Sequence, residues 1–192
     1  MKDDFINNVN DFNSILINSF IKENFICLDA TVGNGNDTLK ILRALNGTGK
    51  IYGLDIQYNA IESTKVLLAS ESSETEVILI NDNHEFLDKY IHEKLNFIIY
   101  NLGYLPGGNK EIKTETDSTL NSLKKSIDLL SDKGLILITV YLSHPGGMDE
   151  YRTIINYLSE LNQRKYNVFK LQFINQKNNP PITIGVEARG GE

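Results

Sequence analysis

The sequence predicts an α/β fold in which a seven-stranded, mostly parallel sheet carries helices on both faces. Short apolar runs alternate with segments of helical periodicity along most of the chain, and this alternation is typical of a parallel sheet covered by helices. The last two apolar runs are joined only by the stretch NQKNNPP. We therefore expect the last strand to return antiparallel in a hairpin.

The N-terminal segment, residues 1–24, predicts a helix that covers the sheet. Its apolar side chains recur at steps of three and four, which is the spacing of one face of an amphipathic helix. They are Phe5, Val9, Phe12, Leu16 and Phe20.

Apolar runs and helical patterns give the remaining elements in order. Strands are expected at 25–30, 51–55, 76–80, 96–101, 134–141, 168–174 and 182–188. Helices are expected at 37–45, 118–130 and 149–161. Asp37 or Thr38 is expected near the N-cap of the first of these helices, because short polar side chains accept hydrogen bonds from free backbone amides there.

Length and composition limit the classes of protein that fit. A chain of 192 residues with 41% hydrophobic content suits one domain over 1–192, with 189–192 as a tail. The N-terminus MKDDFINNVN lacks the pattern of a secretory signal, and no apolar run is long enough to span a membrane. We therefore expect a soluble, cytoplasmic protein with no membrane partner.

Cysteine usage and charge exclude further classes. The only cysteine, Cys27, lies in an apolar strand, so the sequence predicts a buried thiol, no disulfide and no Cys-based zinc site. The formal net charge of −6 argues against tight, sequence-blind binding to a phosphate backbone. A nucleic acid held transiently on a local patch remains compatible with this charge.

A glycine-containing loop, DATVGNGND, joins the first strand to the first helix of the sheet. Ligands of open α/β sheets bind at this carboxyl edge. Gly33 and Gly35 allow a sharp turn and close approach of a ligand to the backbone at a helix N-terminus. A simple turn would also use this pattern. The candidate cofactor-binding residues of the loop are Asp29, Gly33, Asn34, Gly35, Asn36, Asp37 and Thr38.

An acidic residue at the end of the second strand strengthens this interpretation. Asp55 is placed to accept hydrogen bonds from both hydroxyls of a ribose, with Gln57 beside it. Dinucleotide-binding loops carry a third glycine where this chain has Thr38, since that pattern admits a pyrophosphate. The loop thus favours S-adenosylmethionine over NAD as cofactor. Methyl transfer from this cofactor requires no metal ion.

Polar residues in the string NDNHE follow the third strand at the same edge. Asn81, Asp82, Asn83 and His84 are candidates for contacts with an adenine rim. Any one of them alone is more often a loop cap.

The string NLGYLPGG directly follows the fourth strand and resembles the (D/N)PP(Y/F) signature of amino-methyltransferases. The resemblance implies that the Asn101 side-chain oxygen accepts a hydrogen bond from an acceptor amine, while Tyr104 stacks on the base. Leu102 and Gly103 replace the two prolines, which predicts a less rigid loop and a more flexible acceptor than a planar exocyclic amine. A Gly-rich turn with a packed tyrosine is the alternative.

The string YLSHPGG follows the fifth strand and opens onto the same edge. His144 or Tyr141 could line the exit path of a proton, since histidine titrates near neutral pH. An imidazole that caps the following helix is an equally good interpretation.

Taken together, DATVGNGND, LDIQ, NLGYLPGG, HPGG and FINQKNNPP resemble one family over residues 29–188. It is the bacterial YtqB/MnmM family of tRNA 5-(aminomethyl)-2-thiouridine methyltransferases, once labelled rRNA methylases. The resemblance implies a Rossmann-like class I methyltransferase fold, with S-adenosylmethionine as methyl donor and the aminomethyl group of a tRNA wobble uridine as acceptor. It also places several residues near the cofactor: Asn34, Asn36, Asp37, Asp55, Gln57, Asn83 and His84.

The implied partner is a tRNA anticodon loop. Because the chain is acidic overall, it would have to bind this loop through a local cluster of Lys and Arg side chains. These are expected at Lys110, Lys113, Lys124, Lys125 and Arg152. A homodimer could bring such patches together, and the sequence leaves the oligomeric state open. Alternatives are a methyltransferase acting on an rRNA or DNA base amine, a non-catalytic nucleotide-binding module, and, least favoured by the glycine spacing, a dehydrogenase.

Overall fold

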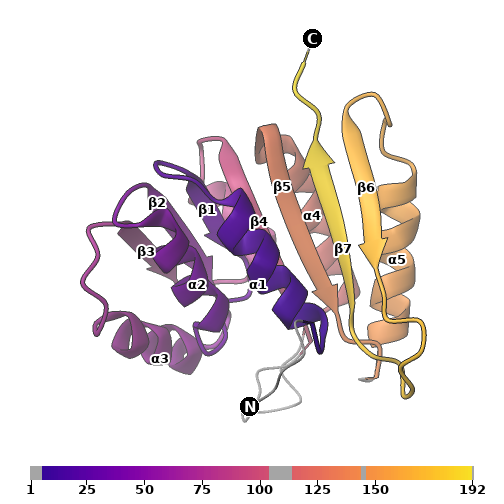
Figure 1. Cartoon of the computed structure of the whole chain (residues 1–192), viewed down its shortest axis with the longest axis horizontal. Coiled ribbons are helices and arrows are strands. Elements are labelled where there is room, and N and C mark those ends of the chain that lie inside the picture. The colour runs from indigo at the N-terminus through magenta and orange to yellow at the C-terminus, as the bar shows by residue number, and fades with distance from the viewer. Residues whose placement is uncertain (1–5, 104–113, 144–145, 192) are drawn as a thin grey trace.

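The structure is a computed structural model that describes residues 6–103, 114–143 and 146–191 (Figure 1). Its strands are β1 (Ile26–Asp29), β2 (Lys50–Leu54), β3 (Glu76–Ile80), β4 (Leu95–Leu102), β5 (Leu130–Val140), β6 (Tyr166–Leu171) and β7 (Ile182–Ala188). Its helices are α1 (Val9–Phe20), α2 (Asn36–Leu45), α3 (Tyr58–Leu68), the 3-10 helix η1 (His84–Lys89), α4 (Thr116–Leu129) and α5 (Gly147–Ser159).

Within these described residues the seven strands form one sheet in the order β3-β2-β1-β4-β5-β7-β6. Strands β1 to β5 pair in parallel, and β7 runs antiparallel to both β5 and β6. This arrangement confirms the fold class and the antiparallel last strand that the sequence predicts. Pairing continues just past β7, because the Arg189 amide donates to the Lys165 carbonyl at 2.7 Å, so the expected tail starts after Arg189.

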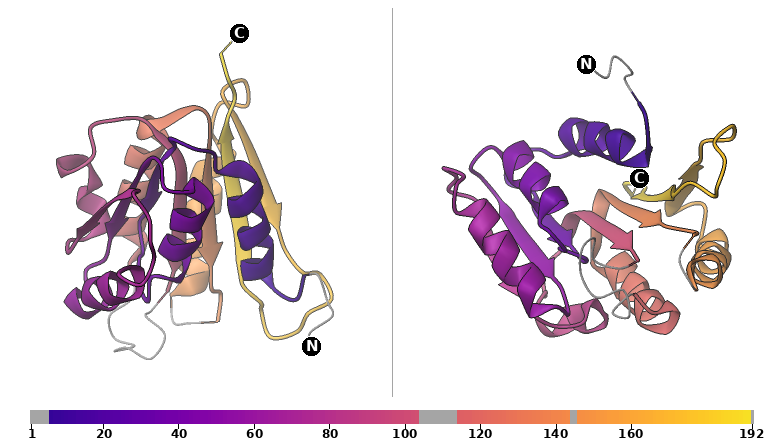
Figure 2. Two further views of the ribbon diagram at one scale, coloured as in Figure 1. Left: turned by 60° about the vertical axis from the view of Figure 1, so that its left-hand side comes forward. Right: turned by 90° about the horizontal axis from the view of Figure 1, so that it is seen from below.

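Helices lie on both faces of the sheet, as the right-hand view of Figure 2 shows from below, and an apolar layer lies under them on each face. Along β4, Phe97 and Ile99 pack with α1 and α2, whereas Ile98 and Tyr100 join the layer under η1, α4 and α5. Alternate side chains of a strand point to opposite faces, so a strand with apolar residues throughout is buried on both. Cys27 is fully buried in the first layer, as expected, and burial raises the pKa of its thiol.

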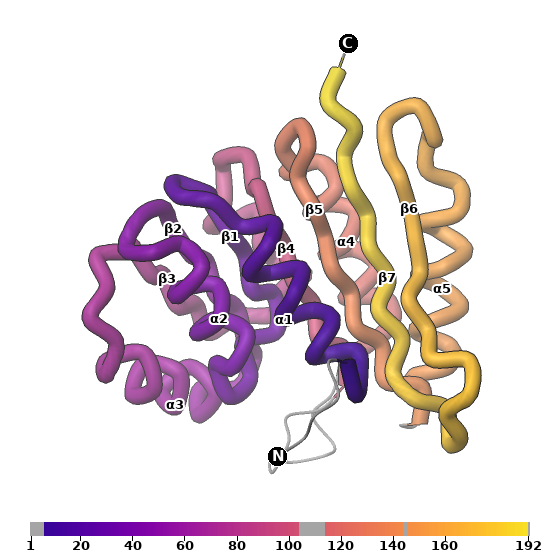
Figure 3. The backbone as a smooth tube through the Cα atoms, in the orientation of Figure 1, coloured from indigo at the N-terminus to yellow at the C-terminus, as the bar shows by residue number. Residues whose placement is uncertain are grey.

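Helix α1 is fixed to the sheet by a polar contact that the apolar periodicity does not reveal. Asn8 caps the helix, and Asn13, only 1% exposed, lies where an apolar residue would be expected. Its amide donates to Thr139 Oγ1 at 2.8 Å and accepts from Thr183 Oγ1 at 3.0 Å. One buried asparagine therefore joins α1 to β5 and β7. Figure 3 shows α1 running obliquely across the front of the sheet.

The carboxyl ends of β1 to β5 meet at one edge of the sheet, which is the lower edge in Figure 1. The last residues of these five strands and the segments that follow them carry the candidate residues of the sequence analysis. The fold thus brings residues from five distant parts of the sequence to one edge.

Candidate active site

The loop after β1 is built around a buried carboxyl group. Asp29 is 2% exposed and accepts hydrogen bonds from Thr38 Oγ1 at 2.6 Å and from the Thr31 amide at 3.2 Å. Burial, and secondly the negative charge of Asp37, raise the pKa of Asp29 to about 7. Asp29 and Thr38 thus hold the loop in shape, with both carboxyl oxygens of Asp29 engaged inside the protein.

The N-cap of α2 is Gly35, and the prediction of Asp37 or Thr38 in that place is wrong. Gly35 has a φ of 77°, and α2 has no side-chain cap. A Cβ built on Gly35 would lie 2.6 Å from Thr64 Oγ1 of α3. The side chains of Asp37 and Thr38 instead contact other elements. Gly35 is therefore required by its backbone conformation and by the close approach of α3.

We predict that Gly35→Ala destabilises the protein much more than Gly47→Ala. Gly47 has nearly the same φ, 81°, but its added Cβ would come no closer than 3.9 Å to a neighbouring atom. Gly47→Ala should cost about 1–2 kcal/mol for the left-handed conformation, and Gly35→Ala a further ~1–3 kcal/mol for overpacking against Thr64. Urea unfolding of both variants checks this, and equal losses would contradict the steric account.

Asp55 directly follows β2, and its carboxylate binds the backbone of the glycine loop. Its two oxygens accept hydrogen bonds from the amides of Gly33 and Gln57, each at 2.8 Å. Gly33 makes this contact in the left-handed backbone conformation, with a φ of 53°. Burial raises the pKa of Asp55, and these two amides oppose that rise. Asn81 braces the same turn by donating to the Asp55 carbonyl at 2.9 Å. The loop and the acidic residue thus meet as the sequence predicts.

The remaining loop residues divide into exposed and capping side chains. Asn34 and Asn36 are exposed on the loop and at the start of α2. Asp82 accepts from the Asn83 amide at 2.8 Å and from the Tyr90 hydroxyl at 2.7 Å, and Asn83 caps η1 through the Glu85 amide at 2.9 Å. Asp82 and Asn83 therefore have the loop-capping role that the sequence analysis kept as the alternative.

His84 differs from its neighbours because its imidazole is buried. It is 8% exposed and packs edge-on against Tyr100, with the ring centroids 5.9 Å apart. Its Nδ1 finds no hydrogen-bond partner in the part of the chain that the structure describes. Burial lowers the pKa of His84 to about 4, so the imidazole is neutral at pH 7.

The lowered pKa of His84 predicts that the protein loses stability in mild acid. The unfolded chain binds a proton on this residue near pH 6.5 but the folded chain only near pH 4, so its contribution is complete above pH 6.5 and is lost as the pH falls towards 4. Between pH 7 and pH 5 the loss should be about 2 kcal/mol.

The matched variant is His84→Phe, which keeps a ring against Tyr100 and has no proton to bind. Urea unfolding at both pH values should show that wild type loses more stability than this variant. Asp29, whose raised pKa acts in the opposite direction, is present in both proteins and cancels in the difference. Equal losses in wild type and variant would refute the assignment to His84.

Asn101, near the end of β4, is held from two sides. Its backbone amide donates to Thr31 Oγ1 at 2.7 Å, and its side-chain Nδ2 donates to Asp37 Oδ2. The other oxygen of Asp37 pairs with Lys40 Nζ at 2.7 Å. The side-chain oxygen of Asn101 is buried and meets no hydrogen-bond donor among the described residues. Asn101 thus offers a fixed, unused acceptor at the carboxyl edge.

Two other predicted residues, Tyr104 and His144, lie outside the described residues, so their proposed roles stay predictions. Tyr141 is half-buried after β5, where its hydroxyl lies 3.5 Å from Asn10 Nδ2 of α1. This contact places Tyr141 beside the start of α1.

Residues that the sequence analysis missed complete this edge. Thr31, Lys40 and Thr64 contact Asn101, Asp37 and Gly35 respectively. Thr31 lies inside the string DATVGNGND, and the spacing of Lys40 three residues after Asp37 on a helix was a usable signal. Thr64 gave no local signal, because its role depends on the packing of α3.

The expected cation patch is largely engaged in local contacts. Lys125 pairs with Asp88 at 2.7 Å, and Arg152 lies 3.5 Å from Asp149. Lys124 lies over the ring of Tyr157. The remaining two members, Lys110 and Lys113, fall outside the described residues.

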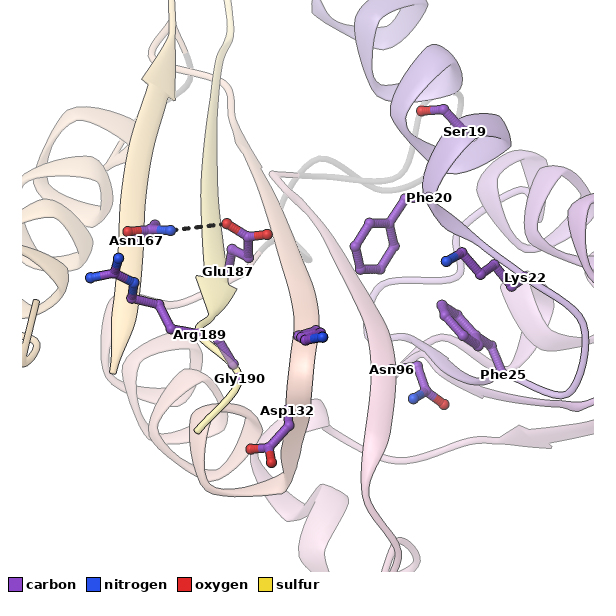
Figure 4. A pocket seen from close by; sticks show the side chains of 12 residues that line it. Ser19, Phe20, Lys22, Phe25, Asn96, Asp132, Asn167, Glu187, Arg189 and Gly190 are labelled. Carbon is purple, nitrogen blue, oxygen red and sulfur yellow. Dashed lines mark hydrogen bonds between the residues drawn. The ribbon is translucent and has the colours of Figure 1, made fainter. Parts of the chain in front are cut away.

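A cavity of about 700 Å³ lies at the opposite edge of the sheet, away from these residues (Figure 4). Phe20 and Phe25 line one side of it, and Glu187 of β7 and Arg189, which follows β7, line the other side. None of the predicted site residues lines it. We therefore assign the candidate site to the carboxyl edge.

Residues 6–103, 114–143 and 146–191 contain no group of three or more His, Cys, Asp or Glu side chains arranged to hold a metal ion. Within the same residues no helix has the length and apolar character needed to cross a membrane.

Comparison with known proteins gives consistent matches over most of the chain. The model of the family described as "Putative rRNA methylase" matches residues 51–187. A curated relative, the chloroplastic tRNA (mnm(5)s(2)U34)-methyltransferase of Arabidopsis thaliana, is 39% identical over 167 residues, which is 82% of this chain and 61% of that protein. The chain therefore spans about three fifths of the length of this relative.

Two solved structures resemble the whole fold. One, titled a "putative rRNA-methylase" of Clostridium thermocellum, is 36% identical, with a TM-score of 0.91 over 95% of this chain and 98% of that one. A methyltransferase of Streptococcus mutans in complex with SAH is 32% identical, with a TM-score of 0.85 over 95% and 99% of the two chains. With the family model matching well over half of its residues, the chain belongs to this rRNA methylase family of class I methyltransferases.

Proposed function

We propose that the protein is an S-adenosylmethionine-dependent N-methyltransferase acting on tRNA. It converts 5-aminomethyl-(2-thio)uridine at the wobble position to 5-methylaminomethyl-(2-thio)uridine. The observation that carries the proposal is the buried side-chain oxygen of Asn101, which meets no hydrogen-bond donor among the described residues and lies at the same edge as Gly33 and Asp55. Identity of 39% to a relative named as a tRNA (mnm(5)s(2)U34)-methyltransferase supports the substrate.

The residues of the carboxyl edge fit the proposed cofactor. Asp55 would accept hydrogen bonds from the ribose hydroxyls. Gly33 and Gly35 have no Cβ, so they adopt positive φ values at these turns and leave room for a ligand beside the backbone. Gln57 and neutral His84 flank this region. When bound, S-adenosylmethionine would supply a methyl group attached to a sulfonium sulfur. The nitrogen lone pair of the acceptor forms the new bond to the methyl carbon, and the electrons of the broken C–S bond stay on sulfur.

The work of the protein in such a displacement is placement. Alignment of the two reactants can contribute roughly 7–11 kcal/mol to lowering the barrier. Asn101 accepts a hydrogen bond from the amine and thereby directs the nitrogen lone pair. The amine must reach the site in its neutral form, and the nitrogen has a proton to release to solvent after transfer. Tyr104, Tyr141 and His144 are proposed to position the uracil and to line that exit.

The other parts of the proposal follow from the substrate. The partner is the anticodon loop of a tRNA, and the site of action is the cytoplasm. A homodimer that presents two surfaces to one tRNA is part of the proposal, and sedimentation of the protein with and without tRNA checks it.

The test compares two tRNA preparations, one with the aminomethyl group at the wobble uridine and one without it. Incubation with enzyme and donor, followed by mass spectrometry of the nucleosides, should show a methylaminomethyl product only in the first. Methylation of rRNA or DNA in parallel incubations, with tRNA unchanged, would favour a base-amine methyltransferase instead. Donor binding without transfer to any nucleic acid would indicate a non-catalytic binding module.

A further inference from the structure

A partly buried network connects the first turn of α2 with the end of β4. Asp37 and Asn101 are 64 positions apart in the sequence, and the side-chain amide of Asn101 donates to Asp37 Oδ2. The Asp37 side chain is 16% exposed, and its second oxygen pairs with Lys40 Nζ at 2.7 Å. Both carboxylate oxygens are therefore engaged within the protein.

We infer that Asp37 is a positioning residue, whose carboxylate fixes the Asn101 amide so that its oxygen, and not its nitrogen, meets the acceptor amine. This inference rests on the proposed function and replaces the cofactor-binding role expected for Asp37. An asparagine amide has nearly the same shape in its two flipped orientations but presents opposite hydrogen-bonding groups.

The charge of Asp37 decides between the two orientations. An ionised carboxylate accepts hydrogen bonds and donates none, so it attracts Asn101 Nδ2 and repels Asn101 Oδ1. The flipped orientation would place the amide oxygen against this carboxylate and the NH₂ group where the substrate amine must donate. Such an NH₂ group offers no lone pair to the N–H of an amine.

Two further contacts make this arrangement rigid. Lys40 holds the far oxygen of Asp37, and Thr31 Oγ1 accepts from the Asn101 backbone amide at 2.7 Å. The side-chain oxygen of Asn101 is then the one polar atom of this network that lacks a partner among the described residues. A hydrogen-bond network in which one buried acceptor alone lacks a donor among the described residues is the arrangement expected when a substrate supplies that donor.

The experiment exchanges the two side chains. Asp37→Asn removes the charge that fixes the orientation and should lower kcat about tenfold or more, with affinity for S-adenosylmethionine and thermal stability close to wild type. Asn101→Asp alone places two carboxylates in contact and should also lower kcat. The double variant D37N/N101D restores one donor and one acceptor oxygen in the same places, and should recover kcat to within about tenfold of wild type.

The matched control is Glu62→Gln on α3. Glu62 and Lys65 form a pair with the same i,i+3 spacing and the same 2.7 Å distance as Asp37 and Lys40, but this pair is exposed and lies on another helix. This variant should keep wild-type kcat, which separates the loss of a helical ion pair from the loss of amide orientation.

The outcomes separate this inference from the proposed function. If wild type methylates aminomethyl-bearing tRNA while Asp37→Asn retains full kcat, or while the double variant is no better than the single ones, the inference is wrong and the proposed function stands. A loss of donor affinity in Asp37→Asn, measured by calorimetry, would return Asp37 to the cofactor site. If wild type itself transfers no methyl group to this tRNA, the proposed function fails.

Discussion

Asn101→Ala is expected to lower turnover by about 100-fold or more, while affinity for S-adenosylmethionine stays close to wild type. The variant removes the buried acceptor that would orient the amine, and misplacement of a reacting group by about 1 Å can cost 10²-fold in rate. Single-turnover transfer to aminomethyl-bearing tRNA measures the first quantity, and calorimetry with the donor measures the second.

The control for this prediction is another asparagine of the same strand. Asn96 lies at the start of β4, at the opposite edge of the sheet, where it accepts from the Ile26 amide at 2.9 Å and donates to Ser131 Oγ at 3.1 Å. Asn96→Ala should cost stability and leave turnover unchanged. Full turnover in Asn101→Ala would remove Asn101 from the site.

Asp55→Ala is expected to weaken binding of S-adenosylmethionine by about 10- to 150-fold, which corresponds to the ~1.5–3 kcal/mol of a hydrogen bond to a charged acceptor. Part of this loss arises indirectly, because the Asp55 carboxylate also holds the amides of Gly33 and Gln57 at 2.8 Å. Calorimetric titration of the variant with the donor checks the prediction.

Asp82→Ala is the comparison for Asp55, because it removes a carboxylate from the end of the next strand. The oxygens of Asp82 are engaged by the Asn83 amide and the Tyr90 hydroxyl within its own segment. Its removal should leave donor affinity within about threefold of wild type. An unchanged affinity in Asp55→Ala, or an equal loss in Asp82→Ala, would refute the ribose assignment.

The fold follows from the sequence to a large extent, because periodicity is a local signal. The strand expected at 76–80 is β3, and the strands expected at 51–55 and 182–188 differ from β2 and β7 by a residue at most at either end. The predicted α4 and α5 begin and end within two residues of the observed helices. The larger errors are α3 and η1, for which the sequence analysis gave no helix, and the start of β5 at Leu130, four residues before the expected start at 134.

The candidate site is predictable only in part, because its contacts join distant segments. Asp37 and Thr38 look like helix caps locally, but Asp37 contacts Asn101 across 64 positions and Thr38 contacts buried Asp29. The sequence placed Gly33 and Asp55 correctly at neighbouring strand ends. The string NLGYLPGG pointed to the side-chain oxygen of Asn101 through its resemblance to amino-methyltransferases. That this oxygen is buried with no hydrogen-bond donor among the described residues depends on the packing of distant segments, for which the sequence gives no local signal.

The most direct test of the account is to locate the transferred methyl group. The enzyme is given aminomethyl-bearing tRNA and a donor with a deuterated methyl group, and the wobble nucleoside is fragmented in the mass spectrometer. The account predicts the label on the side-chain nitrogen of the wobble uridine, in wild type and not in Asn101→Ala. A label on a ring atom, on the ribose or on another nucleoside would contradict it.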